Sequence, residues 1–174
     1  ILHQEGKGVP QNYNSAINYY KLAAQRGVAS AYVQLGKLCF EGKGCKKDFE
    51  HAKFFFENAA LIDQDCYYYV GLIYYVKKKY TEAKTYFEIA AANGFPMALA
   101  NLGNLYLEGF GVGKNISKAK EYLNEAAKMN EPNSLLNLGY IYYYGLDGVV
   151  DYLRAKYYYE LCAKQGNTFA YYAL

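Results

Sequence analysis

Apolar residues recur along the chain with the period of an amphipathic helix, in paired segments. The clearest pair lies within residues 97–132. Its first segment places on one helical face Ala98, Leu99, Leu102, Gly103, Tyr106 and Leu107. Its second segment does the same with Ile116, Ala119, Tyr122, Leu123, Ala126 and Ala127. Gly109, Gly111 and Gly113 stand between the segments, so the pattern predicts two helices, A and B, joined by a glycine-rich turn.

This two-helix unit recurs along the whole chain. A pair of small residues late in helix B occurs at Ala23-Ala24, Ala59-Ala60, Ala90-Ala91, Ala126-Ala127 and Cys162-Ala163, at spacings of 36, 31, 36 and 36 residues. A glycine in helix A recurs at Gly36, Gly71, Gly103 and Gly139. An alanine early in helix B recurs at Ala16, Ala52, Ala83, Ala119 and Ala155. Because three landmarks share one period, the sequence predicts an all-α solenoid of stacked helix–turn–helix repeats.

The landmarks make residues 1–174 a single array. It consists of a partial repeat at 1–28, repeats at about 29–63, 64–95, 96–131 and 132–167, and a truncated repeat at 168–174. Residues 1–8 are expected to hold the end of a truncated helix A and its turn. The repeat at 64–95 differs from the others, because residues 76–79 between its helices read Val-Lys-Lys-Lys and contain no glycine.

Residues at the predicted helix ends support this division. Four residues before each helix-B alanine stand Asn12, Asp48, Lys79, Asn115 and Asp151, and all except the lysine are good N-caps. Eleven residues after it stand Gly27, Asp63, Gly94, Asn130 and Gly166, which tolerate left-handed geometry at a helix end.

Small and large residues of the repeat predict its packing. The glycine of helix A is expected to let helix B approach closely with its pair of small residues. Large helix-B residues are then expected to fill the space between repeats. They are Tyr19, Phe55, Tyr86, Tyr122 and Tyr158 at one position, and Tyr20, Phe56, Phe87, Leu123 and Tyr159 at the next.

The repeat resembles the Sel1-like repeat (SLR) family, a branch of the tetratricopeptide superfamily. The resemblance is carried by Ala-x-x-x-Leu-Gly-x-x-Tyr-x-x-Gly-x-Gly-Val at residues 98–112, followed by Ala119, Tyr122, Ala126 and Ala127. It covers essentially the whole chain and implies a right-handed superhelical solenoid. Members of this family serve as adaptors in endoplasmic-reticulum-associated degradation, as activators of cell-wall enzymes, and as bacterial secreted or effector proteins.

Composition excludes several functions. Apolar residues make up 53% of the chain, too many for disorder, and no run of 18 apolar residues predicts a transmembrane span. Nineteen Lys and Arg against 16 Asp and Glu give a net charge of +3, too balanced to favour nucleic acid as a partner. With two histidines and no Cys-x-x-Cys pattern, the sequence carries no metal, cofactor or catalytic signature. We therefore expect no enzyme activity, no cofactor and no small-molecule substrate.

The four cysteines, Cys39, Cys45, Cys66 and Cys162, occupy different positions of the repeat. Some secreted bacterial members of the resembling family carry one regular disulfide per repeat, and the irregular placement here does not fit that scheme. Because the positions are expected to point in different directions, we predict free thiols that pack as small apolar side chains. This favours a cytoplasmic protein, while a secreted effector or a lumenal protein stays open.

The resemblance implies that helix A lines the concave face of the solenoid. The residues expected to meet a partner there are Gln34, Lys37, Tyr68, Tyr69, Leu72, Asn101, Asn104, Asn137 and Tyr140. Amide side chains hydrogen-bond both N–H and C=O groups of an extended peptide, and Tyr and Leu supply apolar contacts. The main hypothesis is a non-catalytic scaffold or adaptor that binds a peptide or protein partner on this face.

Two other functions stay open. The chain is also consistent with a regulatory or substrate-delivering segment of a larger enzyme such as a kinase. The turns between helices are expected to form a basic rim, defined by Lys43, Lys46, Lys47, Lys77, Lys78 and Lys79, which could contact anionic lipid or RNA. The open ends of the solenoid also allow self-association.

Overall fold

The computed structural model describes residues 12–173, and the chain is entirely helical over this range, without a strand. The helix-B elements are α2 (Tyr13–Ala24), α4 (Phe49–Ala60), α6 (Tyr80–Ala92), α8 (Ile116–Lys128) and α10 (Tyr152–Lys164). The helix-A elements are α3 (Ala29–Glu41), α5 (Tyr67–Val76), α7 (Pro96–Glu108), α9 (Pro132–Tyr144) and α11 (Thr168–Tyr172), with a short 3₁₀ helix η1 (Gln64–Cys66) before α5. The expectation for residues 1–8 lies outside the described residues.

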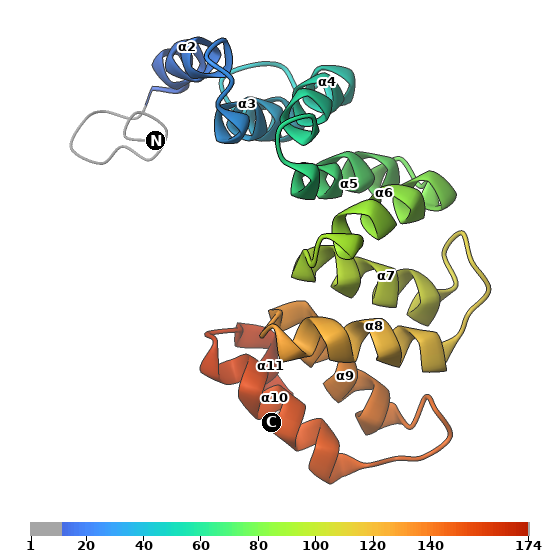
Figure 1. The fold of residues 1–174 in the computed structure, drawn as a ribbon. Helices are drawn as coiled ribbons and strands as arrows, with labels where there is room; N and C mark the ends of the chain where they lie inside the picture. The colour runs from blue at the N-terminus through green and yellow to red at the C-terminus, as the bar shows by residue number, and fades with distance from the viewer. Residues whose placement is uncertain (1–11, 174) are drawn as a thin grey trace.

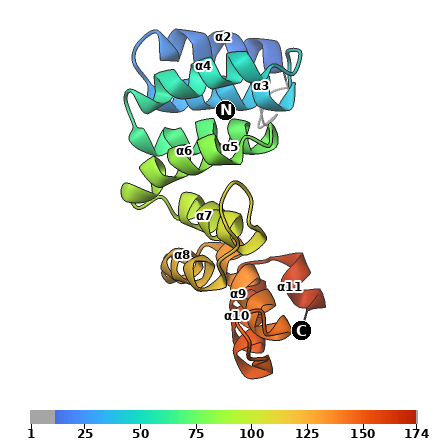
Figure 2. The same ribbon diagram turned by 90° about the vertical axis from the view of Figure 1, so that its right-hand side faces the viewer.

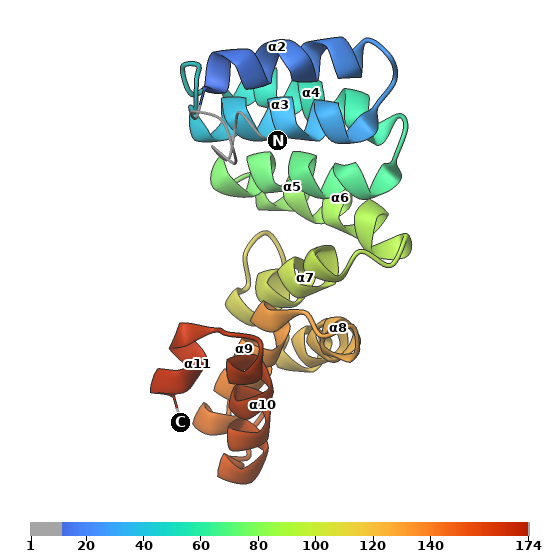
Figure 3. The same ribbon diagram turned by 90° about the vertical axis from the view of Figure 1, so that its left-hand side faces the viewer.

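The helix pairs stack along a curved path from α2 to α11 (Figure 1). Seen from the two sides, α2, α3 and α4 run across the view, whereas α9 and α10 are turned steeply away from that direction (Figures 2 and 3). Successive pairs therefore rotate, which agrees with the right-handed superhelical α-α solenoid that the family resemblance implied. The core is a row of apolar clusters that link neighbouring repeats. In one of them, Ala52 and Phe56 of α4 pack with Val70 and Ile73 of α5.

The predicted N-caps are confirmed. Side-chain oxygens of Asn12, Asp48, Asn115 and Asp151 accept hydrogen bonds from backbone N–H groups in the first turns of α2, α4, α8 and α10. Lys79 makes no such bond at α6. The left-handed geometry is also confirmed at Gly27, Gly94, Asn130 and Gly166, where φ is +76°, +80°, +58° and +83°. The same prediction is wrong for Asp63, whose φ is −139° and whose side chain instead accepts a bond from the N–H of Asp65 to cap η1.

The repeat without turn glycines closes differently from its neighbours. Only residues 77–79 separate α5 from α6, whereas residues 42–48 separate α3 from α4. Lys78 adopts the left-handed conformation, at φ +58°, that glycines supply elsewhere. A long side chain thus occupies a strained backbone position because the turn is short.

The helix-A glycine does allow a close approach, but its partner differs from the prediction. A Cβ atom on Gly103 would lie 2.6 Å from Cγ of Leu123. The same clash would occur between Gly71 and Phe87, and the large residue at this position is buried in every repeat. The glycine therefore makes room for one large helix-B side chain of its own repeat, and the pair of small residues is not what it accommodates. That side chain also reaches the following repeat: Phe56 stacks on Tyr69 of α5, and Leu123 packs with Leu138 and Ile141 of α9. The prediction that it fills the space between repeats is therefore confirmed.

The neighbouring helix-B position carries rings that lie nearer the surface. Here Tyr86, Tyr122 and Tyr158 are half-buried and stack on helix-A tyrosines of the same repeat, whereas Tyr19 is 62% exposed.

The expected separation of the cysteines is wrong for one pair. The Sγ atoms of Cys39 and Cys45 lie 3.8 Å apart, because the end of α3 and its turn fold onto each other. Cys66 and Cys162 are buried, and all four are free thiols. Among the helices of residues 12–173, none combines the length and apolarity that crossing a bilayer would require.

Candidate functional site

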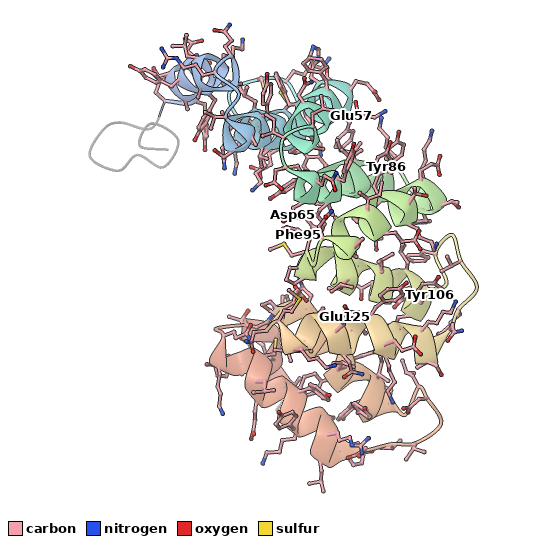
Figure 4. All side chains as sticks on the ribbon, viewed as in Figure 1. Glu57, Asp65, Tyr86, Phe95, Tyr106 and Glu125 are labelled. Atoms are coloured by element: carbon pink, nitrogen blue, oxygen red, sulfur yellow. The ribbon has the colours of Figure 1, made fainter. Side chains whose placement is uncertain are left out.

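Two adjoining hollows lie between α3, η1, α5 and the start of α7, and we call them together the inner groove. Their volumes are about 290 and 240 Å³. Lys37 and Tyr69 line both. In Figure 1, α3 and α5 lie on the inner side of the curve and α4 and α6 on the outer side. Figure 4 accordingly shows Asp65 and Phe95 along the inner side, with Glu57 and Tyr86 on the outer side.

The Tyr69 ring forms the floor shared by the two hollows. It stacks on the ring of Phe56, with centroids 4.9 Å apart and planes inclined by 19°. The ammonium nitrogen of Lys37 lies 4.9 Å from the Tyr69 centroid, a cation–π contact. Packing thus holds the Tyr69 ring between Phe56 and the ammonium of Lys37, so an apolar group of a partner could contact the edge of the ring.

Carboxylates occupy the opposite end of the groove. Asp63 and Asp65 line the hollow that also contains Ser30, Gln34 and Phe95. Burial raises the pKa of Asp65, and the nearby charge of Asp63 raises it further. Two acidic groups near each other favour a positively charged group between them, so this end of the groove is suited to a basic side chain.

Four predicted partner-binding residues line the inner groove: Gln34, Lys37, Tyr69 and Leu72. Tyr68 does not lie there, because its side chain is 9% exposed and belongs to the core with Phe87 and Leu102. Burial raises the pKa of the Tyr68 hydroxyl to about 12. Neighbouring helix residues point about 100° apart, and here only the second of the two tyrosines faces the groove.

The three predicted asparagines use their amides inside the array. The Nδ2 of Asn101 donates to the carbonyl of Met97 at 2.8 Å. The Nδ2 of Asn137 donates to the Oδ1 of Asn104 across neighbouring repeats. Tyr140 is 43% exposed and packs its ring against Tyr144, with centroids 4.6 Å apart. These residues line neither hollow of the inner groove.

Sequence reasoning missed Asp63, Asp65 and Phe95 as groove residues. A signal was present, because the link between helix B and helix A carries two carboxylates only at residues 63–65, where the other links carry at most one. The sequence predicts a helix-end role for Asp63, whereas the structure shows it as the cap of η1 and as part of the groove lining.

The basic rim is partly neutralised. Lys43 pairs with Glu41 at 2.7 Å, and Lys77 pairs with Glu50 of the preceding helix B. The Lys47 ammonium lies 5.0 Å from the centroid of the Phe49 ring. Lys46, Lys78 and Lys79 are exposed and form no ion pair with any residue in the described range. The rim therefore offers fewer available charges than the sequence suggested. Within residues 12–173, no three His, Cys, Asp or Glu side chains are grouped so that they could hold a metal ion.

Comparisons with known proteins agree with this architecture. The sequence profile of the Sel1 repeat matches residues 1–28, 29–62, 66–95, 96–131 and 132–167. The crystal structure of a Sel1 repeat protein from Oxalobacter formigenes is 30% identical and superimposes with a TM-score of 0.83, over 97% of this chain and 71% of that one. Immunity protein Pa5087 from Pseudomonas aeruginosa is 27% identical, with a TM-score of 0.69 over 88% of this chain and 59% of that one.

A curated relative shares part of the sequence. The ERAD-associated E3 ubiquitin-protein ligase component HRD3B of Arabidopsis thaliana is 36% identical over 94 residues. The match covers 53% of this chain and 15% of the length of that relative. Since the Sel1 profile covers most of the sequence and the fold agrees with a solved member, the chain belongs to the Sel1 repeat family.

Proposed function

We propose that this protein is a non-catalytic interaction scaffold that binds an extended segment of a protein partner in the inner groove. Membership of a family of protein-interaction repeats supports the scaffold role. The observation that carries the choice of surface is the pair of adjoining hollows that share Tyr69 and Lys37. Together they combine a packed aromatic ring, a cation and the carboxylates of Asp63, Asp65 and Glu41, of which Glu41 already pairs with Lys43.

The groove chemistry defines the partner segment. An apolar or aromatic side chain would contact the edge of Tyr69, and a basic side chain would lie between Asp63 and Asp65. The basic group would relieve the repulsion by Asp63 that adds to the effect of burial on the pKa of Asp65. Gln34 offers both a donor and an acceptor for the backbone of the segment. The proposed surface extends along α7 and α9 through the other predicted residues, Asn101, Asn104, Asn137 and Tyr140. The three amides keep hydrogen-bonding capacity beyond the bonds described above, and the Tyr140 ring is exposed.

The basic rim is the second candidate surface, with an anionic lipid or RNA as its ligand. Ion pairs of Lys43 and Lys77 with acidic residues reduce its available charge, and this favours the inner groove. The Arabidopsis relative is a ubiquitin ligase component by name, which supports an adaptor role or service to a larger enzyme.

Affinity capture with mass spectrometry tests the proposal through matched variants. Lys37→Glu with Gln34→Ala changes the groove, and Lys78→Glu with Lys79→Glu changes the rim at exposed residues without ion pairs. We expect the groove variant to lose at least about tenfold in affinity for the main captured protein, a value typical of a residue near the centre of an interface. The rim variant should retain it. Loss in the rim variant alone, with binding that falls steeply as salt rises, would assign the function to the rim.

A further inference from the structure

The outer face carries a repeated arrangement of rings and charges. A helix-A tyrosine stacks on a helix-B tyrosine of the same repeat, with ring centroids 5.3 Å apart for Tyr74–Tyr86, 5.8 Å for Tyr106–Tyr122 and 5.7 Å for Tyr142–Tyr158. A lysine from the preceding helix B lies over two of these helix-A rings: Lys53 is 5.3 Å from the centroid of Tyr74, and Lys120 is 4.6 Å from that of Tyr142. Glu57 and Tyr86 mark this face in Figure 4.

The junction between α2 and the α3–α4 pair lacks this arrangement. Cys39 stands at the helix-A tyrosine position and Ile17 at the lysine position. Lys21 stands where three other repeats carry Glu57, Glu88 and Glu160. Phe55 keeps the helix-B ring, whose ring contact is an edge-on one with Phe54 at 5.6 Å. The ring and the cation that fill the other junctions are therefore both missing here.

A hollow of about 330 Å³ occupies this junction, and we call it the outer hollow. Its size falls within the range of about 300 to 1,000 Å³ that is common for ligand pockets. Buried Leu35 and Leu38 form its base, and Ile17 and Phe55 are its other large apolar residues. Leu35 and Leu38 belong to α3, whereas Ile17 lies on α2 and Phe55 on α4. The two helices α2 and α4 lie on the outer side of the stack (Figures 1 and 2).

The polar residues of the outer hollow leave a net positive charge available. The carboxylate of Asp48 is already engaged, because it accepts bonds from the N–H groups of Glu50 and His51 and contacts the His51 ring at 2.8 Å. Lys21 and Lys46 also line the hollow, and neither forms an ion pair with another residue of the described range. Cys39 and Cys45 complete the lining as free thiols.

We propose that the outer hollow binds an aromatic side chain of a partner protein that lies next to an acidic residue. The ring would take the place that Tyr74, Tyr106 and Tyr142 fill at the other junctions, stacked on Phe55 and in contact with Ile17 and Leu35. The neighbouring carboxylate would pair with Lys21 or Lys46. This contact is separate from the inner groove, because the two surfaces lie on opposite sides of α3 and α4.

Titration of the ¹⁵N-labelled chain with the peptide acetyl-Glu-Tyr-Glu-amide, followed by two-dimensional NMR, tests this proposal. We expect saturable shifts of amide signals in α2, the end of α3 and the start of α4. Acetyl-Glu-Leu-Glu-amide, without the ring, and acetyl-Lys-Tyr-Lys-amide, with the opposite charge, should each bind at least about fivefold more weakly. Equal affinity of either control peptide would overturn the assignment of ring or charge.

Two variants connect the shifts to the outer hollow. Ile17→Lys with Cys39→Tyr restores the residues of the other junctions, and should weaken the peptide at least about tenfold because the protein's own ring fills the site. Lys21 is exposed, so we expect Lys21→Glu to leave the fold intact. This variant should weaken peptide binding about three- to tenfold. Unchanged affinity in both variants would refute the proposal. Lys37→Glu in the inner groove should leave this titration unchanged, and loss of the shifts in that variant would place the peptide in the groove instead.

Discussion

Because the helix-A glycine is closely packed, we expect its replacement by alanine to destabilise the fold, although helix propensity alone would favour alanine. At an open helical position, replacing Gly by Ala stabilises by about 1 kcal/mol. At Gly103 the new Cβ would lie 2.6 Å from Cγ and 2.8 Å from Cδ2 of Leu123, and 3.3 Å from the carbonyl oxygen of Ala119. Leu123 is fully buried among Leu107, Leu138 and Ile141, so it has little room to move.

The expected magnitude follows from these two opposing effects. Overpacking of this kind costs about 1–3 kcal/mol, against the gain of about 1 kcal/mol from propensity. Gly103→Ala should therefore lower the free energy of unfolding by up to about 2 kcal/mol, and Gly103→Leu by more. In a Leu123→Ala background the two obstructing atoms of Leu123 are gone and only the 3.3 Å approach to the carbonyl oxygen of Ala119 remains. The same Gly103→Ala change should then be neutral or stabilising by up to about 1 kcal/mol.

Urea unfolding followed by circular dichroism measures the free energy of unfolding of the native chain, the two single variants and the double variant. The four values are compared only if the slope of free energy against urea concentration, the m-value, is the same for all of them. Gly113→Ala is the matched control, since a Cβ there meets no atom within 4 Å and its φ is not positive. That variant should be neutral or stabilising by about 0.4–1 kcal/mol. If Gly103→Ala stabilises the native chain as much as the Leu123→Ala chain, the glycine is not a packing requirement and the reasoning fails.

Two further predictions concern the segment around Cys39. Glutathione disulfide should oxidise Cys39 and Cys45 to an intramolecular disulfide before Cys66 or Cys162 reacts, because the first two Sγ atoms are 3.8 Å apart and the other two thiols are buried. Peptide mapping of the unreduced protein by mass spectrometry checks this, and a first bridge through Cys66 or Cys162 would contradict it. Hydrogen bonds from His51 lower the pKa of Asp48 from 3.8 to about 2. A lowered pKa adds stability that is complete above pH 3.8 and is lost as the pH falls through about 2, so Asp48→Asn should flatten the acid side of a plot of urea midpoint against pH.

Features set by local chemistry could be predicted from the sequence. Helix positions, the caps at Asn12 and Asp151, and the turn that lacks glycine all depend on residues within a few positions of each other. The prediction of left-handed geometry was wrong for Asp63, because aspartate suits both a left-handed helix end and an N-cap. In the structure it caps the 3₁₀ helix that follows it. The sequence could not decide between these two local uses.

The candidate site was predictable only in part, because it depends on distances between repeats. Tyr68 and Tyr69 are adjacent and both were expected on the concave face, but their side chains point about 100° apart. Tyr68 therefore packs into the core with Phe87 and only Tyr69 lines the groove. The bond between Asn104 and Asn137 joins residues one repeat apart, and the period of the sequence does not give the distance between their side chains. The neighbouring thiols of Cys39 and Cys45 were missed for a different reason, because they lie in one repeat and the fold of its turn brings them together.

The places where the chain departs from its own repeat coincide with its candidate surfaces. Positions shared by all repeats, such as the helix-A glycine and the large residue facing it, are explained by packing alone. Positions that differ carry the acidic link at residues 63–65 in the inner groove, the lysine turn at residues 77–79 in the rim, and the substitutions around Cys39 in the outer hollow. In a solenoid, each repeat obtains stability from the same contacts, so a departure that leaves a hollow sacrifices packing that the neighbouring repeats retain. Restoring the shared residue at such a position should therefore stabilise the fold while it removes binding, which separates a functional departure from a neutral one.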